Sequence, residues 1–349
     1  HRLPFFFIKN FVVLLCQNSL YCLGKLFYFL YVKVIEHLRK QGTTTPISFE
    51  ILPPLKGKSM DSVSKILDEL VEYNPSFINV TYHRTEYKYK LRENGLFEKV
   101  YTRKRPGTVG ICAAIQYKYG IDAVPHLVCG GFSRNETEDA LLDLNYLGID
   151  NVLLLRGDPI KTEKIFQPEL DGNHNSLELI QQVVNLNKGI YLEEELEDST
   201  QTNFCIGVSG YPEKHYESPN SEADLRFLKK KVDSGADYIV TQMFFDNQKY
   251  FDFVQRCRAA DIHVPIIPGL KPITTLKQVY SLPGYFHVSI PDELCKQIEA
   301  CKNNKEDIKK AGIEWLANQC KELIQFGVPC LHFYTMSKAD HVKALMKLL

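Results

Sequence analysis

Short apolar segments that alternate with amphipathic segments constrain the fold of this chain more than any other feature. Each is about six to eight residues long and ends at a turn residue or a polar cluster. Segments of this length and nearly continuous apolar character are typical of strands buried on both faces of a parallel sheet. We predict such strands at residues 47–52, 77–82, 123–129, 151–156, 204–211, 238–245, 264–270 and 330–335.

Helical patterns fill most of the intervals between these strands. Apolar residues recur at helical spacing in residues 59–73, and Ser133 with Glu136 has the spacing of a capping box at the start of a helix over 133–147. We also interpret the charged segment 88–104 as helical. Further helices are predicted at residues 108–118, 176–187, 221–234, 247–260, 274–282, 291–301, 305–326 and 338–348. Strands and helices that alternate over roughly 300 residues predict an α/β fold of one domain, the (β/α)8 or TIM barrel, with two extra helices before the last strand.

Residues 1–32 differ from the rest of the chain. They contain no acidic residue and nine aromatic ones. A membrane anchor needs about 20 apolar residues, and residues 11–32 approach this length but are interrupted by polar residues from Gln17 to Ser19 and by Lys25. A signal peptide needs a small residue at its cleavage site, but no alanine precedes Ala113. We therefore interpret residues 1–32 as a non-native or unrelated extension, with an anchor as the alternative. We assign residues 33–349 to the barrel, and expect a chain that begins near Lys33 to be folded and active.

Charge and cysteine content exclude several classes of protein. Lys+Arg and Asp+Glu both number 42, so the net charge is zero and nothing favours a nucleic-acid partner. The ten cysteines are scattered, with no C-x-x-C pair and no cluster at zinc spacing, so we predict no metal site. Such thiols are typical of a reducing compartment, and we expect a cytoplasmic protein. The sequence has no G-x-G-x-x-G segment and no P-loop, so a nucleotide cofactor would bind outside a Rossmann crevice.

Polar residues inside or directly after the apolar strands form the second informative pattern. Glu50 lies inside the first strand, where burial raises the pKa of a carboxyl and suits it to general acid catalysis; a solvated edge strand is the alternative. His126 also fits a core histidine, and Arg156 with Asp158 also fits a surface ion pair. The carboxyl ends of barrel strands, however, meet at one mouth, where ligands bind. We therefore expect one site built from Glu50, Thr81, His126, Arg156, Asp158, Tyr211 and Gln242.

Nine short motifs occur in an order that resembles one known family. They read ISFEILPP, NVTYH, VPHLVC, LLLRGDP, GYPEKH, ADLRFLKKKVDSGAD, TQMFFD, IPGLKP and HFYT, and the resemblance that they carry covers about residues 34–349. This series is similar to that of the methylenetetrahydrofolate reductases, which are flavin-dependent barrels. The resemblance implies that FAD takes hydride from NADH or NADPH and passes it, in a ping-pong reaction, to 5,10-methylenetetrahydrofolate. The product would be 5-methyltetrahydrofolate, which feeds methionine synthesis, and the enzyme would be a homo-oligomer.

The resemblance also implies roles for individual residues. Glu50 would protonate the folate, and Asp158 would tune the charge around flavin and pterin as the second catalytic residue. The run from Lys229 to Lys231 would by itself be a solvated helix face, but the resemblance places cofactor contacts there. The implied FAD contacts are Tyr82, His126, Arg156, Gly157, Asp158, Tyr211, His215, Asp224, Lys230 and Lys231. The implied substrate contacts are Glu50, Thr81, Asp158, Gln242, Gln278 and Lys338.

Several positions depart from the family pattern. Ile51 and Leu52 follow the acid where aromatic residues are common, and Leu282 stands where some members have an aromatic residue that stacks on the ligand. Lys338 replaces an arginine, which keeps the charge but not the bidentate geometry. We expect the short bacterial type, in which no adenosylmethionine-binding domain follows the barrel. Two other functions stay open: a different FAD barrel oxidoreductase such as a proline dehydrogenase, and an inactive barrel that acts as a binding protein.

Overall fold

Parallel strands form the centre of the molecule. The computed structural model describes residues 32–349 except residues 40, 41, 43 and 161, so the predictions for residues 1–32 lie outside the described part apart from Val32. The strands pair in the order β10-β11-β1-β2-β5-β6-β7-β8-β9, and every neighbouring pair is parallel. Their bounds are β1 Ile47–Ile51, β2 Phe77–Val80, β5 Asp122–Val128, β6 Asn151–Leu155, β7 Cys205–Gly210, β8 Tyr238–Thr241, β9 Ile266–Ile267, β10 Gly269–Leu270 and β11 Leu331–Tyr334.

The sheet closes into a barrel through its seventh predicted strand. This strand is divided into β9 and β10 at Pro268, which has no N–H to donate to a ladder. β9 pairs with β8, and β10 pairs with β11, so the two ends of the sheet are one short stretch of chain. The backbone N–H of His332 donates to the Pro268 carbonyl (3.1 Å), which carries the ladder across the break. The predicted (β/α)8 barrel is therefore confirmed.

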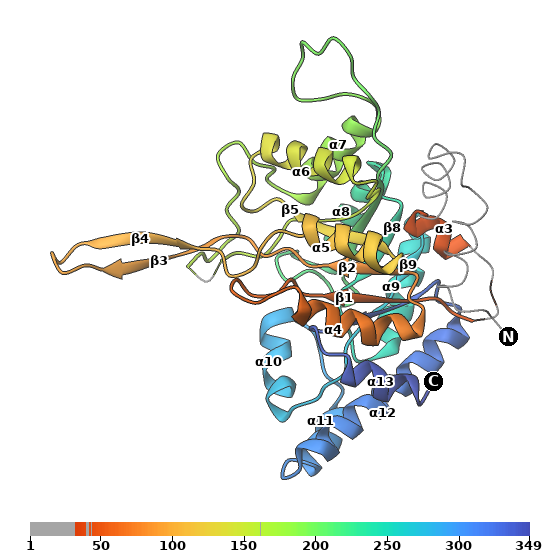
Figure 1. The fold of residues 1–349 in the computed structure, drawn as a ribbon. Helices are drawn as coiled ribbons and strands as arrows, with labels where there is room; N and C mark the ends of the chain where they lie inside the picture. Colours follow the sequence, from red (N-terminus) through yellow and green to blue (C-terminus); the bar gives the residue numbers. More distant parts are fainter. Residues whose placement is uncertain (1–31, 40–41, 43, 161) are drawn as a thin grey trace, which may run out of the picture.

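Helices cover the outside of the barrel (Figure 1). Apart from the segment 88–104, they confirm the predicted helices to within a few residues, including the pair inserted before the last strand. Their bounds are α4 Asp61–Leu70, α5 Val109–Ala114, α6 Arg134–Tyr146, α7 Ser176–Asn187, α8 Ser221–Asp233, α9 Asn247–Ala259, α10 Leu276–Phe286, α11 Asp292–Ala300, α12 Lys305–Phe326 and α13 Asp340–Met346. Short 3-10 and π turns extend α4 and α5 over Val71–Tyr73 and Ile115–Tyr119. In the part of the chain that the structure describes, no helix combines the length and hydropathy that a bilayer crossing needs.

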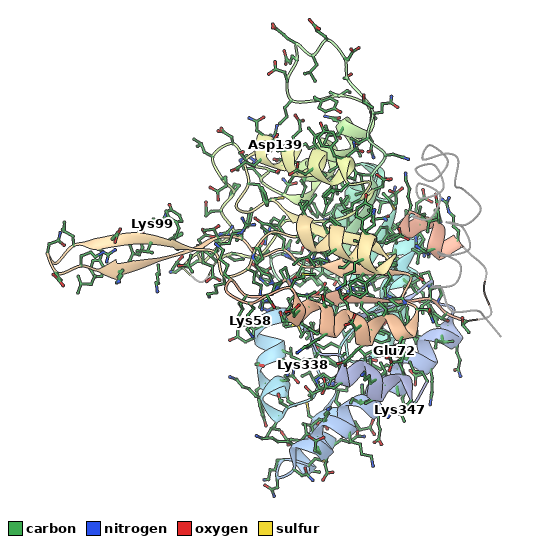
Figure 2. The ribbon with its side chains drawn as sticks, viewed as in Figure 1. Lys58, Glu72, Lys99, Asp139, Lys338 and Lys347 are labelled. Carbon is green, nitrogen blue, oxygen red and sulfur yellow. The ribbon has the colours of Figure 1, made fainter. Side chains whose placement is uncertain are left out.

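The prediction of a helix over residues 88–104 is wrong. The segment forms an antiparallel hairpin of β3 (Glu86–Leu91) and β4 (Phe97–Thr102) that projects away from the barrel (Figure 1). Lys99 lies on this hairpin (Figure 2), with its ammonium 4.0 Å from the centre of the Tyr87 ring. The sequence alternates aromatic and charged residues here, and Asn94-Gly95 is a frequent hairpin turn. The high charge content favours a helix, whereas the alternation of aromatic and charged residues with a period of two is the pattern of a strand.

A short helix closes the bottom of the barrel. In α3 (Val34–Arg39), the Val34 side chain is fully buried against the barrel interior. The backbone N–H groups of Val32 and Val34 donate to Asp122 Oδ1 (3.1 Å) and Asn151 Oδ1 (2.8 Å), at the first residues of β5 and β6. His37 Nε2 lies 2.6 Å from the second Asp122 oxygen. Residues 32–39 therefore pack against the barrel through Val34 and are part of the folded domain.

Two truncations test this contribution of α3. A chain that begins at Val32 keeps every one of these contacts, so its midpoint of thermal unfolding is expected to match that of the full chain. A chain that begins at Gly42 lacks α3, so the apolar surface of the barrel that Val34 covers becomes exposed to water. Burial of one such side chain contributes about 1.5–3 kcal/mol. Its unfolding midpoint is expected to fall by several degrees. Equal midpoints for the two truncated chains would show that α3 does not stabilise the barrel.

Candidate active site

Glu50 lies on β1 near the carboxyl end of the barrel, and burial raises the pKa of its carboxyl to about 8. The Thr335 hydroxyl donates to the Glu50 carbonyl (2.7 Å), which fixes the strand at this point. His126 Nε2 lies 3.6 Å from the Glu50 carboxyl, but burial lowers the pKa of this imidazole to about 3. The imidazole is therefore neutral and adds no positive charge that would ionise the acid. A carboxyl with such a pKa holds its proton near neutral pH, which is the state that a general acid needs.

A cavity of about 430 Å³ opens one strand away from this acid, which does not itself line it. It lies where β10 and β11 lead into α10 and α13, and it is lined by Tyr334, which is Glu50's partner on β11, and by Thr335 directly after that strand. Three of the positions singled out from the sequence line it as well: Gln278, Leu282 and Lys338.

Two predicted substrate contacts have part of their hydrogen-bonding capacity in use. The Gln278 side-chain oxygen accepts from the backbone N–H groups of Thr274 (2.7 Å) and Thr275 (3.1 Å), and so caps α10. The Gln242 side-chain oxygen accepts from the N–H of Met243 (2.9 Å). Each amide nitrogen has no described protein acceptor. Toward a ligand, both residues would therefore act as donors.

Part of the set predicted to hold a flavin gathers around the ends of β6 and β7, namely Arg156, Asp158, Tyr211, His215, Asp224 and Lys231. The Lys231 ammonium is buried and donates to the Ser209 carbonyl (2.5 Å), and burial lowers its pKa to about 8. The Arg156 guanidinium pairs with Glu217 and lies 5.0 Å from the centre of the Phe166 ring. Burial lowers the pKa of His215, another predicted flavin contact, and both cations lie close enough for their charges to lower it further.

Asp224 and Lys230 differ from these residues in what they do. The Asp224 carboxylate accepts from the His215 N–H (3.2 Å) and the Ser218 hydroxyl (2.8 Å), so it orders the loop that carries His215. Lys230 is one position before Lys231 on α8, which turns its side chain toward the exposed face. Among the described residues the Lys230 side chain has no hydrogen bond or ion pair. The structure does not bring Lys230 together with the other predicted cofactor contacts.

Tyr82 and Thr81 begin the loop after β2. The Tyr82 hydroxyl accepts from Arg103 Nη2 (2.9 Å), and its ring lies 4.9 Å from that of Phe132. The Thr81 hydroxyl lies 3.2 Å from His83 Nε2. The buried Nε of Arg103 has no partner. The sequence did not single out Arg103, because Arg103 lies in the segment 88–104, which is predicted as a helix.

Tyr334 and Lys271 are two further residues that the sequence analysis did not single out. The Tyr334 hydroxyl donates to the Thr241 carbonyl (2.6 Å), and Lys271 follows β10 directly. Both line the cavity one strand away from Glu50. The rule that found Asp158, a polar residue directly after an apolar strand, would also have found Lys271.

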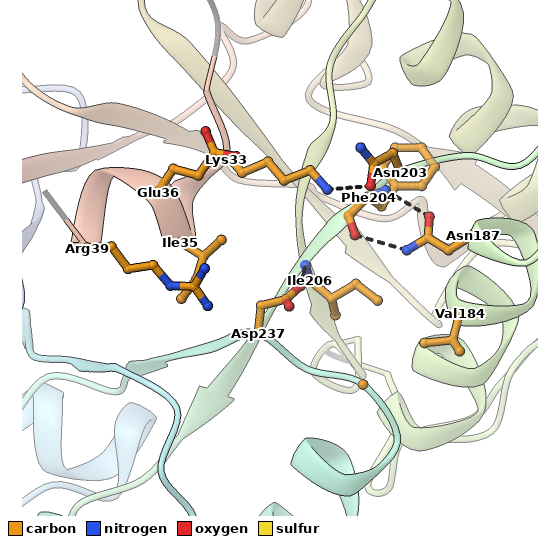
Figure 3. A pocket seen from close by; sticks show the side chains of 11 residues that line it. Lys33, Ile35, Glu36, Arg39, Val184, Asn187, Asn203, Phe204, Ile206 and Asp237 are labelled. Atoms are coloured by element: carbon orange, nitrogen blue, oxygen red, sulfur yellow. Dashed lines mark hydrogen bonds between the residues drawn. The ribbon is translucent and has the colours of Figure 1, made fainter.

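A second cavity, of about 420 Å³, lies at the opposite end of the barrel between α3 and α7 (Figure 3). Lys33 donates to Asn203 Oδ1 (2.5 Å), and Asn187 donates to the Phe204 carbonyl (3.0 Å). These polar groups already have partners, and no predicted site residue lines this cavity. The candidate site is therefore the mouth at the carboxyl ends of the strands.

A parallel (β/α)8 barrel with a largely buried acid, buried cations and a cavity at the carboxyl ends of its strands is typical of TIM-barrel enzymes. The sequence profile of the family described as "Methylenetetrahydrofolate reductase" matches residues 33–349. The chain belongs to the methylenetetrahydrofolate reductase family.

Individual relatives agree with this family. The chain is 31% identical to the 5,10-methylenetetrahydrofolate reductase of Salmonella typhimurium, over 84% of this chain and 87% of the relative. It is 32% identical to methylenetetrahydrofolate reductase (NADH) 1 of Arabidopsis thaliana, over 88% of this chain. The match spans about half (48%) of that plant protein.

A solved structure shares the fold. It is that of an uncharacterized protein from Clostridium thermocellum that binds two copies of 5-methyl-5,6,7,8-tetrahydrofolic acid. The TM-score is 0.52, the identity is 16%, and the match covers 87% of this chain and 94% of that one.

Proposed function

We propose that this barrel reduces 5,10-methylenetetrahydrofolate to 5-methyltetrahydrofolate in the cytoplasm, with NADH or NADPH as the hydride donor and FAD as the carrier. The observation that carries this proposal is Glu50, whose side chain is only 14% exposed, whose pKa is raised to about 8 by burial, and which lies one strand away from residues that line the mouth cavity. Family membership supports this reaction over that of a proline dehydrogenase.

The residues at the mouth fit a flavin dinucleotide. Gly157 has φ +86°, and a Cβ added there would lie 3.3 Å from the Val128 side chain, so the backbone turns tightly beside the barrel. Lys231 and Arg156 offer the positive charge that a diphosphate needs. The unpartnered Arg103 Nε is a further donor beside Tyr82. We assign the diphosphate to Lys231 and Arg156, and the edge of the ring system to Asp158, Tyr211 and His215.

The chain's own residues would act on the folate in two ways. The Glu50 carboxyl would give its proton to a folate nitrogen as the methylene bridge opens, which leaves an iminium carbon that accepts hydride. Gln242, Gln278 and Lys338 would orient the substrate by donating to its carbonyl and carboxylate oxygens. A bound flavin supplies a store of two electrons, which lets nicotinamide and folate use the same position in turn.

Initial-rate kinetics test this proposal. When NADH and methylenetetrahydrofolate are varied together, parallel double-reciprocal lines are expected, with 5-methyltetrahydrofolate as the product. NADPH in place of NADH then reveals the preferred donor. Lines that intersect would contradict the shared position, and the absence of the methylated product would overturn the proposed function.

Substitution of neighbouring lysines tests the flavin site. In Lys231→Met the aliphatic stem stays but the buried charge is lost. Because a hydrogen bond to a charged group contributes about 1.5–3 kcal/mol, the Kd for FAD is expected to rise by at least about tenfold. Lys230→Met removes the exposed charge on the same helix and is expected to change the Kd by less than about twofold. Flavin fluorescence on dilution measures both values, and equal Kd values for the two variants would remove Lys231 from the site.

A further inference from the structure

Lys271 is a buried cation in the mouth cavity that the proposed reaction does not use. Its side chain is 9% exposed and lines the cavity directly after β10. No described residue forms a hydrogen bond or an ion pair with its ammonium. An unpaired buried charge is costly, so a ligand or a functional partner must account for it.

The register of three adjacent strands places Lys271 level with Glu50. Leu270 on β10 is the partner of Phe333 on β11, and Tyr334 on β11 is the partner of Glu50 on β1. Lys271, Tyr334 and Glu50 therefore occupy one row across the mouth. Neighbouring strands lie about 4.8 Å apart, so the ammonium and the carboxyl lie within reach of each other's charge without forming an ion pair.

The other titratable groups around this row are neutral or positive. His126 on β5 faces Glu50 as a neutral imidazole, and Tyr334 between the two has a pKa raised well above its usual value by burial. Lys338 after β11 and His341 on α13 line the same cavity as Lys271, and burial lowers the pKa of His341. Glu50 is therefore the carboxyl that Lys271 acts on.

We propose that Lys271 is a positioning residue that sets the acid strength of Glu50. The proposal rests on the proposed function and deepens it. When Glu50 gives its proton to the folate, a carboxylate is left in a buried site, and the Lys271 ammonium across Tyr334 stabilises that negative charge. The proton consequently leaves more readily than it would from an isolated buried acid. Lys338, which repels Lys271, would bind the substrate's own anionic end instead.

The charges act on each other in the direction that this role requires. Burial raises the pKa of Glu50, and the charge of Lys271 lowers it again, to about 8. Burial lowers the pKa of Lys271, and the charge of Glu50 raises it again, also to about 8. Removal of the cation should therefore raise the pKa of Glu50 further.

The test is a direct titration of Glu50. In infrared difference spectra of the protein, the carboxylic acid band of Glu50 is the one that Glu50→Gln removes. In Lys271→Met this band is expected to persist to a pH about one unit higher than in the native chain, and in Lys271→Arg to stay within about half a unit. Lys277→Met, which removes an exposed charge on α10, is the matched control and should not shift the band. If Lys271→Met does not fold, Lys271→Gln carries the same expectation.

Kinetics of the two half-reactions complete the test. For Lys271→Met, the alkaline limb of the folate half-reaction is expected to move up by about one pH unit, with a rate about threefold to tenfold lower at neutral pH. Reduction by NADH should stay within about twofold. An unshifted acid band overturns the role of Lys271 whether or not the chain reduces folate. A shifted band without folate reduction would overturn the proposed function and keep the link between Lys271 and Glu50.

Discussion

Replacing Glu50 by glutamine is expected to slow the folate half-reaction by at least about two orders of magnitude, while FAD binding and reduction by NADH stay within about twofold. The amide keeps the size and hydrogen-bonding capacity of the acid but has no proton to transfer. Methylenetetrahydrofolate needs that proton before it accepts hydride, whereas hydride transfer from a nicotinamide does not. Stopped-flow absorbance measures the two half-reactions separately.

Two controls exclude a structural cause for this loss. Glu72→Gln, on the exposed 3-10 turn after α4 (Figure 2), should leave both half-reactions unchanged. Because the folded-state pKa of Glu50 is raised from 4.5 to about 8, this group's contribution to stability is fully present below pH 4.5 and is lost as the pH rises from 4.5 through about 8. Glu50→Gln removes that loss, so the variant should be no less stable than the native chain at pH values above 8. Equal slowing of both half-reactions would point to a structural role, and slowing of neither would exclude Glu50 as the acid.

Replacing Gly312 by alanine is expected to lower the free energy of unfolding by at least about 2 kcal/mol. Alanine in the middle of a helix normally stabilises by about 1 kcal/mol relative to glycine. A Cβ at Gly312, however, would lie 1.7 Å from the Ile273 carbonyl oxygen, so α12 has to move away from the segment that follows β10. Overpacking of this kind typically costs 1–3 kcal/mol or more. Because that segment also carries Lys271, the folate half-reaction should slow as well.

Gly284 provides the matched control for this substitution. It also lies in a helix, α10, but a Cβ added there would have no neighbour within 4 Å. Gly284→Ala is therefore expected to be neutral or to stabilise by up to about 1 kcal/mol. Denaturant unfolding monitored by circular dichroism gives both values. A stabilised Gly312→Ala variant would show that α12 does not pack as closely as described.

The strands were predictable because barrel strands are buried on both faces and therefore read as continuous apolar runs. The hairpin of β3 and β4 was missed, although alternation at Tyr87 and Tyr89 and the Asn94-Gly95 turn were visible, because it stands outside the core and its charges dominate the pattern. The division of the seventh strand was also readable, since Pro268 cannot donate to a ladder. The close approach at Gly312 was not readable, because it depends on how α12 crosses a distant segment.

The candidate site was predictable where one strand suffices to place a residue. Glu50 and His126 were found because a polar side chain inside an apolar run needs a reason to be there. Gln278 caps α10. Thr275 and Gln278 have the spacing of a capping box, so this role could have been predicted from the sequence. The position of Lys271 after an apolar strand marks it as a candidate, but its place level with Glu50 follows only from the register of β10, β11 and β1, which no local pattern gives.

One anaerobic titration tests the central claim that a single mouth passes hydride from nicotinamide to folate. The purified protein is expected to show a flavin absorbance band, to lose it on addition of NADH or NADPH, and to recover it on addition of methylenetetrahydrofolate in equal amount. A protein that carries no flavin, as an inactive binding barrel would, or a reduced flavin that methylenetetrahydrofolate fails to reoxidise, would contradict the account.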